Sequence, residues 1–474
     1  MKATTRPATA TARPAPADPG VRHALRRLIT LLALTPLLVL LAARAPGLIR
    51  APLLLGYGFL VLAGTTAMLF IAYVHYEDPA EGTLRRRPRN AAGFPALPAH
   101  PRVSFLLAVK DEEDRIEACV RSMVVDDHPD TQVIVVDDAS TDRTPAILRA
   151  LAAELPVRVV RLDTNVGKKR ALVRAAALAD GAVLAFTDSD CVLAPDALSR
   201  CVAALVAHPE LGAVGGHARA LNADDTLLTR VQDVWYEGQF RIGKAAEAVF
   251  GAVTCISGPL AVFRRDAVYN YLPAWADDRF LGRDFRFATD RQLTGYVLGQ
   301  RRLGRRLKER HADSPFVTAA DHPELPWRTG YVRSATVHTT VPARLRPFLR
   351  QQVRWKKSFI RNIFFTGTFI WRCGPGAAVL YYGHVLWVLV APVMAVRHLV
   401  WAPLTGAAVL TLLYLAGILL KGAVWGAAFR LDHPGSTRWR YRPLMSLLSA
   451  TLLSWLLAWS LLTIRRGVWS RSAT

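Results

Sequence analysis

Acidic residues follow short apolar runs at several points of this chain, where they could bind a cation or accept a proton. Asp137 and Asp138 come directly after one run, Asp188 and Asp190 follow another, and Asp290 lies in the segment ATDRQLT. Two carboxylates at the end of a strand share one side of a loop, where they can hold Mg²⁺ or Mn²⁺ together with a diphosphate. A solvated acidic turn has the same local sequence, so the interpretation depends on the order of these sites along the chain.

A second group of reactive side chains lies in the dodecamer QQVRWKKSFIRN (351–362), just before a long apolar region. Arg354 offers planar donors that match a phosphate, and the indole of Trp355 offers a flat face on which a sugar ring can stack. Together with Gln351, these residues suit an anionic ligand that carries a ring. A basic amphipathic helix lying on anionic lipid is the alternative. Three cations of the same helix are expected to face the membrane, namely Lys356, Lys357 and Arg361.

Short β-rich runs that end in polar loops surround the acidic residues. They are VSFLLAV (103–109), VIVVDDAS (133–140), VRVVRLD (157–163) and AVLAFTDSD (182–190), with helical patterns between them at 144–155 and 168–178. Strands that alternate with helices predict a mainly parallel α/β sheet with ligand chemistry at the carboxyl ends of its strands. The acidic residues fall at that edge.

The composition indicates a membrane protein. A net charge of +23 over 474 residues first suggests nucleic acid as a partner. However, 52% of the residues are apolar, and they are concentrated towards the two ends of the chain, where arginines flank them. Cytoplasmic flanks of membrane spans have this pattern, so we expect membrane lipid, and no nucleic acid, as a partner. The five cysteines are scattered and lack the spacing of a metal site.

The lengths of the apolar segments predict how the chain is divided. The stretch 444–464 has basic residues at both ends, which favours a re-entrant or interfacial helix pair over a span. The division that we predict is a disordered N-terminus (1–20), two transmembrane helices (28–76), an α/β domain (101–340), interfacial helices (341–370), two further transmembrane helices (376–430) and a C-terminal interfacial or re-entrant segment (441–474).

Six segments occur in the order that is typical of one enzyme family. They are VVDDAS (135–140), NVGK (165–168), TDSD (187–190), CISGP (255–259), ATDRQLT (288–294) and QQVRWKKSFIRN (351–362). With them the chain resembles the membrane-integrated, processive, inverting family 2 glycosyltransferases, and it is most similar to hyaluronan synthases and to the chitin-oligosaccharide synthases of nodulation. The resemblance implies a cytoplasmic GT-A (Rossmann-like) glycosyltransferase domain combined with transmembrane and interfacial helices in a multi-pass protein of the plasma membrane.

The resemblance also implies a role for each matching residue. Asp190 would ligate Mg²⁺ or Mn²⁺, and Asp290 would be the general base that deprotonates the acceptor hydroxyl. The residues implied for nucleotide-sugar binding are Ala108, Asp138, Lys168, Asp188, Gln351, Arg354 and Trp355. Those implied for acceptor binding are Cys255, Ser257, Gly258 and again Trp355. The segment LLTIRRGVWSR (461–471) resembles the gating loop of the family, with Trp469 as its aromatic residue.

Two positions depart from the family pattern. Ala139 stands where the family usually has glycine, and because a small residue is kept we expect little effect. Thr289 stands where hyaluronan synthases usually have an acidic residue, which weakens the transfer of their substrate specificity to this chain.

The implied product is a β-linked polysaccharide that contains GlcNAc, made from UDP-GlcNAc and UDP-GlcA as hyaluronan is, and secreted through a channel that the chain itself forms. The alternatives are a chitin-like polymer from UDP-GlcNAc alone and a cellulose-like polymer, with a non-catalytic export component as a remote one. The growing polysaccharide is a further partner, and a second copy of the chain could complete the channel.

Overall fold

The computed structural model describes residues 35, 39, 52–82, 93–285 and 289–466. The predicted disordered N-terminus and Trp469 lie outside the described residues. So does the first predicted transmembrane helix, apart from positions 35 and 39.

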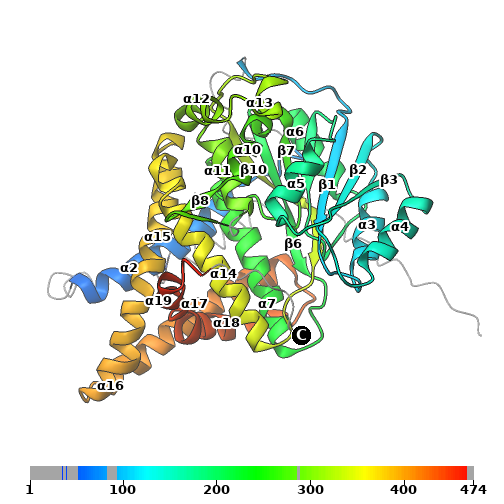
Figure 1. Ribbon diagram of the computed structural model, residues 1–474. Coiled ribbons are helices and arrows are strands. Elements are labelled where there is room, and N and C mark those ends of the chain that lie inside the picture. The colour runs from blue at the N-terminus through cyan, green and yellow to red at the C-terminus, as the bar shows by residue number, and fades with distance from the viewer. Residues whose placement is uncertain (1–34, 36–38, 40–51, 83–92, 286–288, 467–474) are drawn as a thin grey trace, which may run out of the picture.

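A mixed sheet forms the centre of the described part, with the strand order β3-β2-β1-β4-β7-β6-β10-β5 (Figure 1). Its strands are β1 (Val103–Val109), β2 (Thr131–Asp137), β3 (Val157–Arg161), β4 (Val183–Phe186), β5 (Cys191–Leu193), β6 (Leu211–Ala220), β7 (Ala261–Arg264) and β10 (Arg328–Thr339). A separate small ribbon pairs β8 (Arg279–Phe280) with β9 (Arg283–Asp284). Every residue of β1 is buried, because helices cover the centre of the sheet.

Helices lie between these strands and after the last of them. They are α3 (Ile116–Val124), α4 (Thr144–Glu154), α5 (Lys168–Ala176), α6 (Ala197–Ala207), α7 (Leu227–Gly238), α8 (Ala245–Val249), α9 (Arg265–Val268), α10 (Leu272–Ala276), α11 (Thr289–Leu298), α12 (Gln300–Arg310), α13 (Pro315–Thr318) and α14 (Leu345–Ile363). The strands and helices predicted between 103 and 190 are confirmed. The helices predicted at 144–155 and 168–178 end one and two residues earlier, at Glu154 and Ala176.

The strand order places a crevice at the carboxyl end of β1. From β1 the chain builds β2 and β3 on one side and then returns to add β4 on the other, all in parallel. Loops that leave β2 and β4 therefore diverge at this point, which is where open α/β sheets bind ligands. Asp138 follows β2 directly, and Asp188 follows β4 by two residues.

The sheet is mainly parallel, as the sequence predicts, but two of its strands are reversed. β7 runs antiparallel to both of its neighbours, β4 and β6, and β5 runs antiparallel to β10. Because β6 and β7 are antiparallel neighbours, the connection between them starts and ends at the same edge of the sheet. That connection contains α7 and α8, and its edge is the one at which β4 ends.

Three helices of the described part are long and apolar enough to cross a membrane, namely Gly56–His75, Pro375–Leu404 and Ala408–Asp432. They comprise α2 (Pro52–Phe70), α15 (Pro375–Val396), α16 (Ala402–Leu404) and α17 (Ala408–Asp432). Figure 1 shows α2, α15 and α16 projecting from the molecule on the side away from β1–β3. A further pair, Arg438–Leu453 and Leu456–Leu462, is bent by 41° and forms either a broken span or a re-entrant loop. It contains α18 (Arg442–Leu448) and α19 (Leu456–Leu462).

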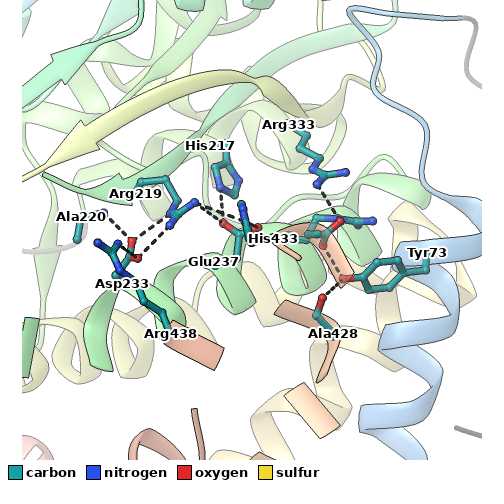
Figure 2. A network of polar contacts seen from close by, with 12 residues as sticks. Tyr73, His217, Arg219, Ala220, Asp233, Glu237, Arg333, Ala428, His433 and Arg438 are labelled. Atoms are coloured by element: carbon teal, nitrogen blue, oxygen red, sulfur yellow. Dashed lines mark hydrogen bonds and ion pairs between the residues drawn. The ribbon is translucent and has the colours of Figure 1, made fainter. Parts of the chain in front are cut away.

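Ion pairs of α7 join the sheet to the segment that follows α17 (Figure 2). The carboxylate of Asp233 accepts hydrogen bonds from Arg219 of β6 at 2.9 Å and from Arg438 at 2.8 Å. Burial opposes the ionisation of Asp233, but the two guanidinium groups outweigh burial and lower the pKa of this carboxyl group. Asp233 thus contacts the sheet and the C-terminal segment at the same time.

One helical turn later, Glu237 of α7 repeats this arrangement. Its carboxylate lies 3.0 Å from Nε2 of His217 in β6 and 3.3 Å from Nε2 of His433. Against the effect of burial, His217, His433 and Arg219 hold the pKa of Glu237 well below its ordinary value. The contact of Glu237 with His217 thus joins α7 to β6.

A third carboxylate, Asp432, ends α17 and contacts both the sheet and the helical turn Ile71–His75 that continues α2. It accepts a hydrogen bond of 2.6 Å from the hydroxyl of Tyr73 and one of 2.9 Å from Arg333 of β10. Arg241 lies 3.1 Å from the same carboxylate. Removal of one partner from such a buried cluster leaves an uncompensated charge, so the cluster fixes how the membrane helices sit on the sheet.

Two glycines of α17 allow α18 to approach it closely. A Cβ atom on Gly422 would lie 2.5 Å from Cα of Pro443, and one on Gly426 would lie 2.8 Å from the carbonyl oxygen of Trp439. The spacing of four residues places both glycines on one face of the helix, as in the G-x-x-x-G pairs of membrane helices. Any larger residue would push the two helices apart.

Substitution Gly422→Ala should therefore destabilise the protein by about 1–3 kcal/mol, because its methyl group collides with backbone that cannot move alone. Gly417→Ala is the matched control, since a Cβ on Gly417 meets nothing within 4 Å on the same helix. Thermal unfolding in detergent, followed by tryptophan fluorescence, should show a lower Tm for the first variant than for the second. Equal Tm values would contradict the close approach.

The turn after β2 contains a strained residue. Ala139 has a φ of 58°, in the left-handed region that glycine adopts without a steric penalty. Its carbonyl oxygen accepts a hydrogen bond of 3.0 Å from Lys110, which holds the turn against the end of β1. The glycine that the family usually has here is therefore explained by backbone conformation, and alanine is the more costly residue at this site.

Ala139→Gly should stabilise the protein by about 1 kcal/mol. The variant removes the cost of the left-handed conformation from the folded state, and part of this gain is offset because glycine gives the unfolded chain more conformational entropy. Ala150→Gly is the control, because Ala150 is exposed in the middle of α4, where glycine costs about 0.5–1 kcal/mol. The two variants should shift the Tm in opposite directions. A decrease in Tm for both would show that the strain at Ala139 is not relieved.

Candidate functional site

One cavity of about 3480 Å³ contains most of the residues that the sequence singles out. It begins at the carboxyl ends of β1, β2 and β4, passes along α14 and continues between α15, α17 and α18. The predicted site residues that line it are Ala108, Asp138, Lys168, Asp188, Asp190, Cys255, Ser257, Gly258, Asp290, Gln351, Arg354 and Trp355. Residues separated by more than 240 positions in the sequence thus share one space.

Asp138 organises the loop that leads into α5. Its two carboxylate oxygens accept hydrogen bonds from the backbone N–H groups of Val166 (2.7 Å) and Gly167 (2.9 Å). Gly167 has a φ of 86°, which directs the chain into α5 at Lys168. Asp138 and Ala108 line the same end of the cavity, so this loop forms one wall of the space that would receive a nucleotide.

Lys168, Asp188 and Gly258 form the floor of the crevice. The ammonium group of Lys168 contacts the Asp188 carboxylate, which outweighs the effect of burial and raises the pKa of Lys168. A Cβ on Gly258 would lie 2.7 Å from Oδ2 of Asp188, so glycine is needed for the carboxylate to occupy this position. The resulting patch offers one cation and one carboxylate to a ligand in the cavity.

Asp188 and Asp190 form a candidate cation site. Ligand atoms of these two residues and of Cys191 lie within 4.8 Å of one another. Burial and the neighbouring Asp188 carboxylate raise the pKa of Asp190 to about 6, although Lys168 opposes the shift. Two oxygen ligands whose charges repel match the preference of Mg²⁺ or Mn²⁺ for carboxylates, so the residues fit such an ion.

Asp290 lies in the first turn of α11, beside the segment that begins at Cys255. The thiol of Cys255 lies 3.5 Å from Oδ2 of Asp290 and 3.9 Å from the hydroxyl of Ser257. Burial and the Asp290 carboxylate raise the pKa of the Cys255 thiol to about 11, so the thiol is neutral and can donate a hydrogen bond. A carboxylate that faces a cavity in this way is placed to accept a proton from a bound hydroxyl group.

The residues of the dodecamer that face the cavity lie on α14. Burial lowers the pKa of Arg354, while Asp188 and Asp190 act in the opposite direction, so its guanidinium lies within electrostatic range of both carboxylates. In the described part of the chain, Oε1 of Gln351 is buried without a hydrogen-bond partner. Such an atom favours a bound group with a donor at this point.

The expectation that Lys357 and Arg361 face the membrane is wrong, because both side chains are buried inside the protein. Lys357 donates to the carbonyl oxygens of Thr463 (2.6 Å) and Arg466 (2.9 Å), at the C-terminal end of α19. Arg361 donates to the buried carboxylate of Asp278 at 2.7 Å. Lys356, the third cation, lines the cavity. Lys357 and Arg361 therefore hold neighbouring protein segments, and the helix is not simply a lipid-surface helix.

Helix α7 supplies two aromatic residues that the sequence analysis missed. Trp235 and Tyr236 line the cavity, with ring centroids 5.6 and 6.2 Å from that of Trp355. They come to the site because the connection between β6 and β7 returns to the same edge of the sheet. The aromatic pair in VQDVWYEGQF was the available signal. However, a helix that connects two parallel strands covers a face of the sheet, and such a helix would not bring the pair to this edge.

Comparison with known proteins identifies the domain. Residues 104–272 match the family described as Glycosyl transferase family 2. The chain is 32% identical to an N-acetylglucosaminyltransferase of Rhizobium meliloti (strain 1021), over 63% of this chain and 65% of that protein. It is 27% identical to a hyaluronan synthase of Streptococcus pyogenes, over 76% of this chain and 80% of that protein.

The alignments do not cover the whole of these relatives. The chain spans less than two thirds of the Rhizobium meliloti protein, and 62% of a second N-acetylglucosaminyltransferase, from Azorhizobium caulinodans, to which it is 33% identical. A solved mannosyltransferase from Pyrobaculum calidifontis has a TM-score of 0.49 at 21% identity, covering 86% of this chain and 99% of that chain. The prediction of a glycosyltransferase domain is confirmed: residues 104–272 of this chain form a family 2 glycosyltransferase domain.

Proposed function

We propose that this protein is a processive, inverting glycosyltransferase of the membrane, which polymerises UDP-sugars into a β-linked polysaccharide that contains GlcNAc. The observation that carries the proposal is the single cavity that holds the carboxylates, the aromatic residues of α7 and α14, and the inner walls of the membrane helices. The names of the similar N-acetylglucosaminyltransferases and hyaluronan synthase support GlcNAc as the donor sugar.

Asp290 acts as the general base of the transfer. Its Oδ2 takes the proton of the acceptor hydroxyl group while the oxygen of that hydroxyl group attacks the anomeric carbon of the donor. A new glycosidic C–O bond forms as the bond from the anomeric carbon to the phosphate oxygen breaks, and UDP leaves with the electron pair. The neutral thiol of Cys255, 3.5 Å from Asp290, and the hydroxyl of Ser257 position the acceptor.

Cationic groups receive the charge that develops on the departing UDP. Lys168 and Arg354 approach the crevice from α5 and α14, where their charges stabilise a diphosphate. Asp188 and Asp190 would hold Mg²⁺ or Mn²⁺, which supplies further positive charge to the diphosphate. Asp138 fixes the loop against which the base of the nucleotide lies.

Secretion through the chain's own membrane helices completes the proposal. A polysaccharide cannot partition into hydrocarbon, so it needs a polar path across the bilayer. The cavity continues from Trp355 towards residues of α15 and α17, and three described helices are long enough to span a membrane. The catalytic domain then lies in the cytoplasm, where UDP-sugars are made, and the aromatic residues near Trp355 bind the newest sugar of the product.

Among the possible products, we favour a hyaluronan-like polymer made from UDP-GlcNAc and UDP-GlcA. The chitin-like alternative uses UDP-GlcNAc alone and is supported by the greater identity to the N-acetylglucosaminyltransferases. Synthesis of the hyaluronan-like polymer requires a uronate donor and synthesis of the chitin-like polymer does not, so an experiment with defined donors can distinguish them.

Asp290→Asn should reduce sugar transfer by about 10²–10⁴-fold, the usual contribution of a general base, while UDP still binds. Asp277→Asn is the matched control, because Asp277 is an exposed carboxylate that does not line the cavity. UDP release measures transfer, and calorimetry measures UDP binding. Turnover of Asp290→Asn equal to that of the control variant would remove Asp290 as the base.

Purified protein in nanodiscs, given Mn²⁺ and each UDP-sugar singly and in pairs, should make long polymer only from UDP-GlcNAc with UDP-GlcA. Chelation of the metal should stop the reaction, because the paired carboxylates then lack their cation. Product length on gels and digestion by a hyaluronan-specific lyase are the readouts. Long polymer from UDP-GlcNAc alone would establish the chitin-like alternative instead.

A further inference from the structure

The membrane helices place two cations on the wall of the cavity. Lys421 lies in the middle of α17, and Arg442 begins α18; both line the cavity beyond the catalytic carboxylates. Among the described residues of α2, α15, α17 and α18 that line it, none is an aspartate or a glutamate. A cation within a membrane span is costly to bury, so it marks a site that binds a ligand or conducts one.

The two cations lie where α17 and α18 touch. The helices touch where Pro443 approaches Gly422, which has no Cβ. Lys421 is the residue before Gly422, and Arg442 is the residue before Pro443. Both charged residues therefore line the cavity beside this contact of the two helices. Like charges that line one cavity repel, and an anion bound beside them would reduce the repulsion.

Each cation has a tryptophan beside it. The ammonium nitrogen of Lys421 lies 3.6 Å from the ring centroid of Trp387, and the guanidinium carbon of Arg442 lies 4.9 Å from that of Trp425. Both tryptophans also line the cavity. Each cation thus covers one face of its indole in a cation–π contact. A sugar that carries an acid group can bind such a wall through its carboxylate to the cation and through its ring to aromatic surface.

Buried donors at this wall lack partners within the described protein. Arg442 is 6% exposed and donates from Nη1 to Ser446 at 3.3 Å, but its Nε has no hydrogen-bond partner among the described residues. The indole Nε1 of Trp425, itself 4% exposed, has none there either. Unsatisfied buried donors are rare, and two of them beside a cavity favour a ligand with acceptor oxygens.

We propose that Lys421 and Arg442, with Trp387 and Trp425, form a subsite that binds the carboxylate of a uronate sugar in the growing polysaccharide. The inference rests on the proposed polymerase function and names the residues that would bind an acidic sugar of its product. A neutral polymer offers hydroxyl groups to this wall and no negative charge, so it would leave both cations uncompensated. The subsite therefore favours passage of a polymer that carries an acid group at regular intervals.

The test compares product length for two donor mixtures in nanodiscs of phosphatidylcholine. Wild-type protein should make long polymer from UDP-GlcNAc with UDP-GlcA and only short oligomers from UDP-GlcNAc with UDP-glucose. Lys421→Gln and Arg442→Gln should each shorten the uronate-containing product about tenfold, the loss expected for one charge-assisted hydrogen bond. Lys421→Arg keeps the charge and should retain the length. The exposed Arg440, two residues before Arg442, supplies the control Arg440→Gln, which should match the wild type.

Two results would overturn the inference without touching the proposed function. One is wild-type protein that builds equally long polymer from both donor mixtures, a result that does not depend on whether any variant folds. The other is unchanged product length in both glutamine variants. Wild-type protein that releases no UDP from any donor would instead overturn the proposed function itself.

Discussion

The charge clusters on α7 and at the end of α17 are the interaction on which the rest of the structure depends. Asp233 and Glu237 contact β6 on one side and the segment after α17 on the other, while Asp432 of α17 contacts β10 and the helical turn that continues α2. These contacts, together with apolar packing of Trp425 and Ala428 against the core of the sheet domain, join the sheet to the membrane helices that border the cavity. Because the carboxylates are buried with several cationic partners each, the arrangement is costly to disturb at any one position.

The same helix couples this joint to the candidate active site. α7 presents its carboxylates to the sheet and the C-terminal segment, and its aromatic residues Trp235 and Tyr236 to Trp355 of α14. α14 is itself held by Arg361, whose partner Asp278 also accepts a hydrogen bond from Lys169, the residue after Lys168. Residues that do not line the cavity thus set the distance between its wall at the start of α5 and its wall on α14.

Local patterns of the sequence predict the first half of the sheet well, because β1 to β4 are buried, apolar and separated by helices of ordinary length. They also predict which residues gather in the crevice, since an acidic residue after a buried parallel strand has little choice of position. They do not predict the reversal at β7, which depends on long-range pairing, and so Trp235 and Tyr236 were missed.

Lys357 and Arg361 were wrongly expected to face the membrane. A helical pattern shows which residues of a helix are cationic, but it does not show their partners Thr463 and Asp278, which are far away in the sequence. The left-handed turn at Ala139 is invisible for a similar reason, since alanine gives no signal of positive φ.

The glycine contact between α17 and α18 has a mechanical consequence. Helices that meet through side chains can separate or slide by changing rotamers, but Gly422 meets the backbone of Pro443, and Gly426 that of Trp439. Backbone has no rotamer to change, so this wall of the cavity cannot widen in small steps. The width of the cavity at this wall is therefore set by backbone, and a ligand bound there must fit a cross-section that side-chain rotamers cannot change.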